Sequence, residues 1–430
     1  MMGRVFSFAF LTAIASAGLG FIAHAQPRES CLAFEDALNL AASNDPGVVI
    51  ARAGLQDAEA DLEEARSLQR PQLSTFSRLG VGDRGLVDSQ IENQIGVRAS
   101  QRLLDFGDAR LARRAAEEDV TAQQSLIIDA ENQAELAAGR AYIEWLEASE
   151  QLSVTSERID YFTRQLDAIE ALLDQGGSTR IERAEVAAEL ATAEAFRFEF
   201  EYLKDQAAAK LAIATGERSE PCKITGRLID PVYDAFDPDL VEKMVQDALK
   251  ANPQIEALRR TRSGLTIAAE REARNRLPAV DLVGIASYGS QDFQGNFDLE
   301  TRLGIDISVP ILSGRALDAR RKRAQAQASR ASGDLFSAER ELRETVEILH
   351  RRSLLLEAQS VRRHTVLTLR NEEFDAALLE HQTGYRTLPD LVDVRIELEQ
   401  ASLAAVSSKY ELERVRLQLN IMTGAHGVMR

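Results

Sequence analysis

The sequence predicts a mainly helical protein with a small β part, in which long antiparallel helices form coiled coils. Three features lead to this fold class: two very long helical runs, two pairs of alternating strands, and an internal two-fold repeat. The clearest run, Gly314 to His381, contains no proline and one internal glycine, Gly333. As one helix it would be about 100 Å long, at 1.5 Å per residue. Helices of globular domains average only about 11–12 residues.

Residues 1–25 have the pattern of a secretory signal peptide. Arg4 precedes an apolar run from Val5 to Ile22, and Ala23-His24-Ala25 forms a small-x-small cleavage site. The run is also long enough for a membrane anchor, but the cleavage site favours removal. No later run of 18 apolar residues occurs, so we expect no membrane-spanning helix in the mature chain.

Charge and cysteine content narrow the choice of partner and compartment. The formal net charge of −17 argues against a nucleic-acid partner, because phosphate backbones attract basic surfaces. The two cysteines, Cys31 and Cys222, lie in short non-helical segments. An exported chain meets an oxidising compartment, so a disulfide between them is plausible; the alternative is two unpaired thiols.

The first half begins with two helices. A short helix is expected over Phe34–Ser43, and Pro46 opens the next one at a position that tolerates proline. That helix should run to about Gln69, because the residue before Pro71 is disfavoured in helical conformation.

Residues 72–83 and 90–104 then predict two strands, joined by a turn at Gly82-Asp83-Arg84-Gly85. Apolar Ile91, Ile95, Val97 and Leu103 alternate with polar Gln94, Arg98, Ser100 and Arg102. A two-residue period of this kind predicts a strand with one apolar and one polar face.

A long helix follows over about 107–175, breaks at Gly176-Gly177, and returns as a helix over about 178–215. Its apolar residues recur every seven positions, at Trp145, Leu152, Ile159, Leu166 and Leu173, with Phe162 and Ile169 three places on from two of them. Such a heptad predicts supercoiling against partner helices. An ordinary coiled coil would show the same pattern.

The second half repeats this plan. Five landmarks recur in order at a spacing of about 207–208 residues: Asn44-Asp45-Pro46 with Ala251-Asn252-Pro253, Arg70-Pro71-Gln72-Leu73 with Leu277-Pro278-Ala279-Val280, Leu104-Asp105-Phe106-Gly107 with Ile311-Leu312-Ser313-Gly314, Gly176 with Gly384, and Thr215-Gly216 with Thr423-Gly424. The repeat indicates two pseudo-equivalent units.

We therefore divide the chain into four parts. They are the signal peptide (1–25), a first repeat (26–216), a linker (217–237) and a second repeat (238–424). In the second repeat, strands are expected at about 279–290 and 299–312, and helices at about 314–381 and 388–423. Its long helix carries a heptad at Leu335, Leu342, Leu349 and Leu356, and its last helix one at Leu391, Leu398, Leu412 and Leu419.

The four strands are too few to close a barrel by themselves. Open strand edges are not tolerated in lipid, so several copies of the chain would have to share one barrel. Two copies give eight strands with a filled interior, whereas three give twelve and a wider lumen, which a conduit requires. The helices that continue from the strands would form a second, helical barrel about 100 Å deep.

Four features of the sequence occur together: the duplicated Asn-Pro, the proline-to-strand junctions, the strand ends Asp105-Phe106-Gly107 and Leu312-Ser313-Gly314, and the segment Gly384–Asp393. In this combination the chain resembles the TolC family of outer-membrane efflux and secretion channels. The resemblance covers essentially the whole mature chain. It implies a homotrimer with a twelve-stranded transmembrane β-barrel in outer-membrane lipid and an α-barrel through the periplasm. It also implies docking to a periplasmic adaptor (membrane fusion) protein and an inner-membrane pump.

Acidic residues follow both helix-turn-helix tips. Asp390 and Asp393 lie six and nine residues after Gly384, and Glu182 and Glu185 lie six and nine residues after Gly176. Around a three-fold axis they would form rings that hold cations and repel one another, as in a periplasmic gate. The alternative is that acids in the first turns of a helix stabilise its dipole.

The resemblance assigns further roles at these tips. Positions matching Asp390 and Asp393 line the family's closed constriction, and those matching Arg386 and Glu182 belong to an ion-pair network that holds it shut. His381 stands where the family has a tyrosine. The residues that we expect to contact the adaptor are Gly176, Gly384 and Leu388.

Several charged residues fall on the polar parity of the strands: Arg78, Arg98, Arg102, Asp281, Arg302 and Asp306. We expect them to face the lumen, because a lysine or arginine facing lipid costs about 2–4 kcal/mol at the bilayer midplane. The alternative is that some lie at the membrane interfaces.

The sequence gives little sign of an enzyme. Residues Gly80–Gly85 fit GxGxxG, but no helix follows, so a nucleotide site is not expected. His350 and His364 would lie about 21 Å apart on one helix, too far to share a metal. We expect no catalytic residue, cofactor or metal site.

Two questions stay open at this stage. A soluble periplasmic coiled-coil scaffold or adaptor would also use long helices, although the twice-repeated strand pairs weigh against it. Within the channel interpretation, the sequence does not decide between small molecules and secreted protein as cargo.

Overall fold

The computed structural model describes residues 31–83, 89–173, 176–224, 226–229, 238–290 and 298–424. The predicted signal peptide, part of the predicted turn (Arg84 and Gly85) and residues 230–237 of the predicted linker lie outside the described residues.

The elements follow one another in an order that occurs twice: two helices, two strands and two helices. They are α1 (Phe34–Asn44), α2 (Pro46–Ser67), β1 (Gln72–Asp83), β2 (Ser89–Leu104), α3 (Asp108–Leu173), α4 (Arg180–Thr215), α5 (Pro238–Ala251), α6 (Pro253–Arg274), β3 (Ala279–Ser290), β4 (Asp298–Ser308), α7 (Ala316–Gln382) and α8 (Leu388–Thr423). The predicted mainly helical class with a small β part is confirmed.

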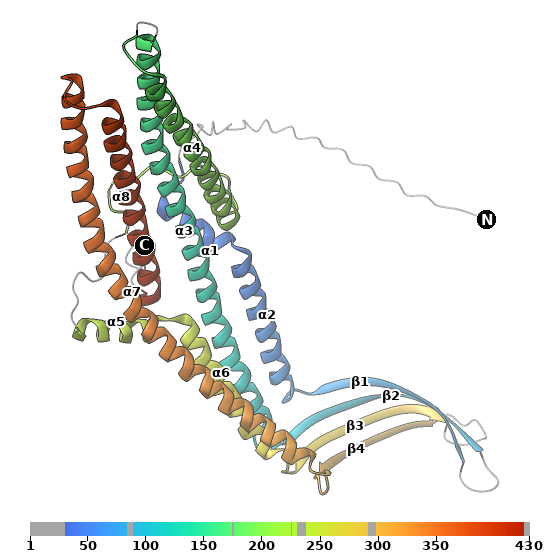
Figure 1. Ribbon diagram of the computed structural model, residues 1–430. Coiled ribbons are helices and arrows are strands. Elements are labelled where there is room, and N and C mark those ends of the chain that lie inside the picture. The colour runs from blue at the N-terminus through green and yellow to red at the C-terminus, as the bar shows by residue number, and fades with distance from the viewer. Residues whose placement is uncertain are drawn as a thin grey trace, which may run out of the picture.

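The molecule is elongated, with the sheet at one end and the tips of two helical hairpins at the other (Figure 1). Helices α3, of 66 residues, and α7, of 67 residues, run from the sheet to those tips. Helices α4 and α8 fold back along them, and α2 and α6 extend toward the sheet. Within the described residues, no helix is both long enough and apolar enough to span a membrane.

The duplicated Asn-Pro landmarks begin helices in both halves. The Asp45 carboxylate accepts a hydrogen bond from Gly47 N at 2.7 Å, and the Asn252 side chain accepts one from Ile255 N at 3.0 Å. Pro46 and Pro253 occupy the first helical positions, where a missing N–H leaves no bond unmade.

The heptad in α7 forms the core between α7 and its neighbours: Leu335, Leu342, Leu349 and Leu356 are all buried. The heptad of α8 is buried as well. In α3 the first heptad member, Trp145, is buried, but Leu152, Ile159, Leu166 and Leu173 are only half-buried. The buried residues there are Phe162 and Ile169, three positions further along from two heptad members.

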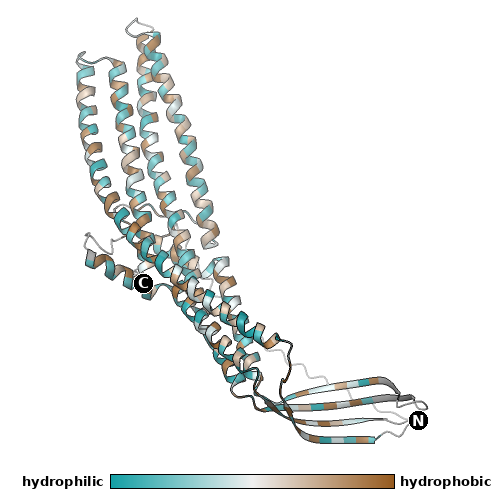
Figure 2. Ribbon diagram, turned by 60° about the horizontal axis from the view of Figure 1, so that its bottom comes forward, coloured by the Kyte–Doolittle hydropathy of each residue, from teal (hydrophilic) through white to brown (hydrophobic). Residues whose placement is uncertain are grey.

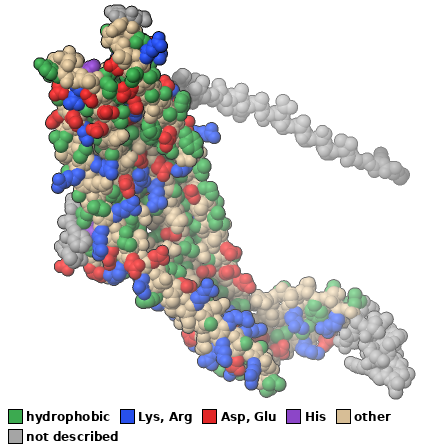
Figure 3. Space-filling view, viewed as in Figure 1, with side chains coloured by type: hydrophobic (Ala, Val, Ile, Leu, Met, Phe, Trp, Pro, Cys, Tyr) green, Lys and Arg blue, Asp and Glu red, His purple; other side chains and the backbone are tan. Residues whose placement is uncertain are grey.

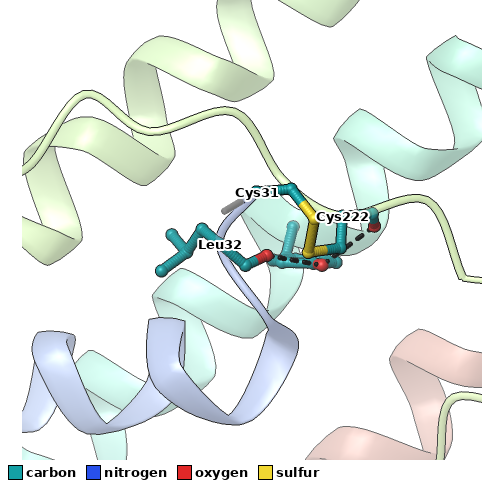
Figure 4. The surroundings of a disulfide bond; sticks show 4 residues. Cys31, Leu32 and Cys222 are labelled. Carbon is teal, nitrogen blue, oxygen red and sulfur yellow. Dashed lines mark hydrogen bonds between the residues drawn. A yellow bond between two sulfur atoms is a disulfide. The ribbon is translucent and has the colours of Figure 1, made fainter. Parts of the chain in front are cut away.

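A disulfide joins Cys31 to Cys222 and ties the start of the described chain to the segment after α4 (Figure 4). Between them, Leu32 N donates to Glu220 O at 2.8 Å and Cys222 N donates to Leu32 O at 2.9 Å. The Tyr142 hydroxyl shares its proton between the carbonyls of Leu32 and Cys222, at 2.9 and 3.0 Å. Burial raises the pKa of Tyr142 to about 12, so the hydroxyl stays a donor.

The sheet has the order β1-β2-β3-β4, and all of its neighbours are antiparallel. Strand β4 ends at Ser308, before the predicted end near 312. Ser308 pairs with Ala279, the first residue of β3, so the ladder has no partner strand beyond it. Pro310 has no N–H to extend the pairing.

The sheet is amphipathic, and colours for hydropathy alternate along its strands (Figure 2). One face carries exposed apolar side chains: Leu73, Leu79, Ile95, Val97, Tyr288, Leu299, Leu303, Ile305 and Ile307. Leu303 is 77 % exposed, which is unusual for leucine in a packed sheet. The predicted charged positions share the opposite face, as the cross-strand pairs Arg102–Asp281 and Asp281–Asp306 require.

Candidate functional site at the tips of the helical hairpins

Both hairpins turn at a glycine with left-handed backbone. Gly176 has φ of +72° and Gly384 has φ of +81°, a region that favours glycine because it lacks a Cβ. Gly177 N donates to Leu172 O at 2.9 Å, and Tyr385 N donates to Glu380 O at 2.9 Å. These bonds satisfy the last carbonyls of α3 and α7 in the same way. The two tips are therefore structurally alike, although their sequences differ.

Each hairpin's second helix begins with a threonine cap, and each cap uses one of the predicted gate acids. Thr179 accepts from Glu182 N at 3.1 Å, while Glu182 Oε2 accepts from Thr179 N at 2.8 Å, forming a capping box. In α8, Thr387 caps Asp390 N and its hydroxyl donates to the Asp390 carboxylate at 2.5 Å. Glu182 and Asp390 thus have local partners within the chain.

These partners change the acidity of Glu182. Its pKa is lowered, first because the Thr179 backbone N–H donates to the carboxylate and then because the Ser178 hydroxyl does so; the charge of His381 adds to the effect. His381 belongs to the other hairpin, so the two tips influence each other electrostatically.

The remaining predicted gate residues differ in how they are held. Arg386 Nε donates to Glu380 Oε2 at 2.9 Å, and His381 Nδ1 lies 3.0 Å from the Arg386 carbonyl. Asp393 is exposed and Glu185 is half-buried. Among the described residues, neither of these acids has an ion-pair or hydrogen-bond partner for its carboxylate.

Leu388, which we expected to contact the adaptor, is not an exposed residue in this chain. It is only 9 % exposed and packs with Phe162, Ile169 and Val186, which belong to the other hairpin. The apolar residues exposed at the tips are Ile181, at 79 %, and Tyr385, at 88 %. Leu388 therefore joins the two hairpins together.

A buried charged network further along the hairpins was not predicted from the sequence. Arg158 of α3 is bound to Glu399 of α8 and, at 2.5 Å, to Glu189 of α4. The side chains of Arg158 and Glu399 are 4 % and 2 % exposed. Burial raises the pKa of Glu399, and the positive charge of Arg158 opposes that shift.

Arg395 of α8 connects this network to α7, the remaining helix of the two hairpins. Its guanidinium lies 5.4 Å from the ring centroids of Tyr161 on α3 and Phe374 on α7. The only signal in the sequence was a charged residue beside several heptad positions, such as Arg158 before Ile159. Most such residues face water, so this signal could not identify the network.

Within the described residues, no group of three or more potential ligand side chains could hold a metal ion. The arrangement described so far is an elongated pair of helical hairpins, with acidic residues near its tips and an amphipathic sheet at its other end.

Comparison with known proteins shows what this arrangement is similar to. Residues 37–217 match the model of the outer membrane efflux protein family. This match covers less than half of the chain. The outer membrane efflux protein BepC of Brucella suis biovar 1 (strain 1330) is 22 % identical over 387 residues, which cover 87 % of this chain and 82 % of BepC. The resemblance to TolC-family channels is thereby confirmed, and this efflux protein is assigned to the cell outer membrane.

Solved channel structures share its fold. The Campylobacter jejuni CmeC outer membrane channel superposes with a TM-score of 0.80 at 14 % identity, covering 97 % of this chain and 94 % of CmeC. The Neisseria gonorrhoeae MtrE outer membrane channel, in its open state, gives a TM-score of 0.75 at 17 % identity, covering 91 % of this chain and 88 % of MtrE.

Replacing Glu182 with alanine should loosen the start of α4 in this efflux protein. The Thr179 N–H loses its acceptor, so amide hydrogen exchange in the first turn of α4 should accelerate by several-fold. Glu182→Gln is the matched control, because its amide oxygen can still accept that bond. Equal exchange in all three proteins would contradict the capping role.

The stability that this cap gives to the first turn of α4 should depend on pH in wild type but not in Glu182→Gln. Because the folded pKa of Glu182 is lowered, its stabilising effect is complete above the ordinary glutamate pKa and is lost as pH falls through the lowered value. Protection factors, which are the intrinsic exchange rates divided by the observed ones, should therefore fall at the tip of wild type as the pH is lowered below the ordinary glutamate range, and should stay constant in Glu182→Gln.

Replacing Arg158 with methionine should strongly destabilise the hairpins. The carboxylate of Glu399 would stay buried without its partner, which costs about 3–5 kcal/mol of unfolding free energy. The double variant Arg158→Met/Glu399→Met should be more stable than Arg158→Met alone. Denaturant unfolding of the detergent-solubilised protein measures both.

An exposed ion pair provides the control for this experiment. Arg183 and Glu170 lie 2.7 Å apart with side chains 47 % and 48 % exposed. Arg183→Met should cost less than about 1 kcal/mol. If Arg158→Met cost no more than Arg183→Met, the buried network would not stabilise the hairpins.

Proposed function

We propose that three copies of this chain form a passive exit duct through the outer membrane. Their sheets together close a twelve-stranded β-barrel in lipid, and their long helices form a tunnel into the periplasm. A periplasmic adaptor protein and an inner-membrane pump deliver the cargo, which is a small molecule or a secreted protein. The duct itself carries out no chemistry.

The exposed apolar face of the four-stranded sheet is the observation that carries this proposal. Strands β1 and β4 each pair on one side only, so the sheet ends in two open edges. An apolar face suits lipid, and lipid offers no water to satisfy open edges. Other copies of the sheet are the natural partners, because their edges carry the same backbone groups.

The surface of α7 supports the same assembly. Beside the buried heptad runs a second apolar stripe, one residue earlier at Ile348 and Leu355, with Leu369 two heptads beyond Leu355. These three side chains are 63 %, 67 % and 57 % exposed. A stripe with this spacing suits a helix of a neighbouring copy.

At the tips, the duct would narrow to a gate. In a three-fold assembly, Asp393 and Glu185 would form acidic rings, with the capping acids Asp390 and Glu182 beside them and Arg386 held by Glu380. Such rings attract cations and repel one another, so the gate would be selective and sensitive to charge. The glycine turns, Gly176 and Gly384, would present the surface for the adaptor.

Replacing Ile305 with arginine should prevent assembly. Ile305 is 61 % exposed on the apolar face, and arginine facing lipid costs up to about 2–4 kcal/mol per chain. We expect wild type to be extracted from outer membranes only with detergent, as a particle with the mass of three chains. The variant should yield little such particle.

Gly304→Arg is the matched control for that variant. Gly304 lies next to Ile305 on the polar face, and an added Cβ would meet no atom within 4 Å. The Gly304→Arg variant should assemble like wild type. A wild-type monomer or dimer released without detergent would contradict the duct and favour a soluble periplasmic coiled-coil scaffold.

Replacing Asp393 with asparagine should weaken cation binding at the gate. With the protein in a planar bilayer, hexaamminecobalt(III) should block wild-type conductance from the helical side, and the half-blocking concentration should rise several-fold in the variant. Asp375→Asn, another exposed acid on the same hairpin, should leave the block unchanged. Identical block in all three proteins would exclude Asp393 from the constriction.

A further inference from the structure

The charges on the polar face of the sheet are separated by sign. Among the residues whose side chains the structure describes, its arginines gather mainly on β1 and β2, at Arg78, Arg98 and Arg102, whereas its acids lie on β3 and β4, at Asp281, Asp298, Glu300 and Asp306. Basic side chains are visible together on the sheet in Figure 3. The described part of β1 and β2 is therefore more basic on this face than β3 and β4.

Two ion pairs lie on this face. Arg102 Nε donates to Asp281 Oδ1 at 2.9 Å, and Arg302 is paired with Glu300 at 3.0 Å. Arg78 and Arg98 differ, because in the part of the chain that the structure describes neither forms an ion pair. Their charge is available to a ligand.

A hollow of about 350 Å³ lies between these two arginines and is lined by Ser74, Phe76, Ser77, Arg78 and Arg98. Ser74 is the cross-strand partner of Arg98, and Arg78 is the partner of Gln94. Positions 94 and 98 are about 13 Å apart at 3.3 Å per residue, a distance that two arginine side chains can bridge around a bound group. On the polar face this lining has two guanidinium groups and the Ser74 hydroxyl, and among the described residues it contains no acid.

We propose that this hollow binds an anionic group of phosphate type on solutes that pass along the polar face. Guanidinium groups bind such oxygens through paired, charge-assisted hydrogen bonds, and the Ser74 hydroxyl can donate a further one. Inside a narrow lumen these contacts are stronger than in bulk water. The proposal rests on the proposed duct, because the duct makes this face the inner wall.

Arg98 also links this site to the helical end of the sheet. It lines a second hollow, of about 390 Å³, together with Arg70, Arg102, Asp281 and Asp306. An anion that leaves the first hollow would meet mixed charge in the second and be held less firmly. The first hollow is therefore the binding site, and the second is part of the path to it.

Pyrophosphate binding to the purified, detergent-solubilised assembly tests the site directly. Calorimetric titration at low ionic strength should show saturable binding to wild type. Arg98→Gln and Arg78→Gln should each raise the dissociation constant about tenfold or more, because each removes a charged hydrogen-bond donor. Arg98→Lys, which keeps the charge without the paired geometry, should lie between wild type and Arg98→Gln.

Arg302→Gln is the matched control. Arg302 shares the polar face and, through Ile285, the same cross-strand row as Arg98, but it is already paired with Glu300. It should bind pyrophosphate like wild type. Absence of wild-type binding, or equal loss in Arg302→Gln and Arg98→Gln, would overturn the site.

Conductance separates this inference from the duct itself. Pyrophosphate added on the sheet side of a planar bilayer should reduce wild-type current, and Arg98→Gln should need about tenfold more for the same reduction. A detergent-extracted trimer that conducts but is not blocked would overturn the anion site alone. A soluble monomer or dimer would overturn the duct and, with it, the inner wall on which the site depends.

Discussion

The open edges of the four-stranded sheet are the constraint on which the rest of the structure depends. Every backbone N–H and C=O that enters lipid needs a protein partner, and β1 and β4 each leave one row of such groups unpaired. Only other strands can complete them. Once several sheets close on one another, the proposed roles follow. The apolar face contacts lipid, the charged face lines the lumen, and the long helices form the tunnel.

The sequence was sufficient for the elements and the turns, because these depend on local chemistry. Period-two alternation identified the strands, and the glycines at 176 and 384 marked the tips where positive φ is required. The sequence was not sufficient for contacts between hairpins. A heptad states which face of a helix is buried but not against which neighbour, so the burial of Leu388 and the pairing of Arg158 with Glu399 could not be foreseen.

The candidate gate acids divide into two kinds that spacing alone does not distinguish. Glu182 and Asp390 hold the first turns of α4 and α8, so their carboxylates already have hydrogen-bond donors. Asp393, three residues further along α8, has none among the described residues. These bonds are what the helix-start alternative expects of the first pair, and Asp393 is the exposed acid without such a bond.

Selectivity in such a duct is decided by local charge and not by the total. The formal net charge of −17 is spread over a molecule whose α7 alone, at 67 residues, is about 100 Å long. At physiological ionic strength the Debye length is only about 8 Å, so exposed charges at the tips and on the sheet do not sense each other. Acids at one end can attract cations while arginines at the other bind anions. A solute would then be selected twice along its path, by two independent sites of opposite sign.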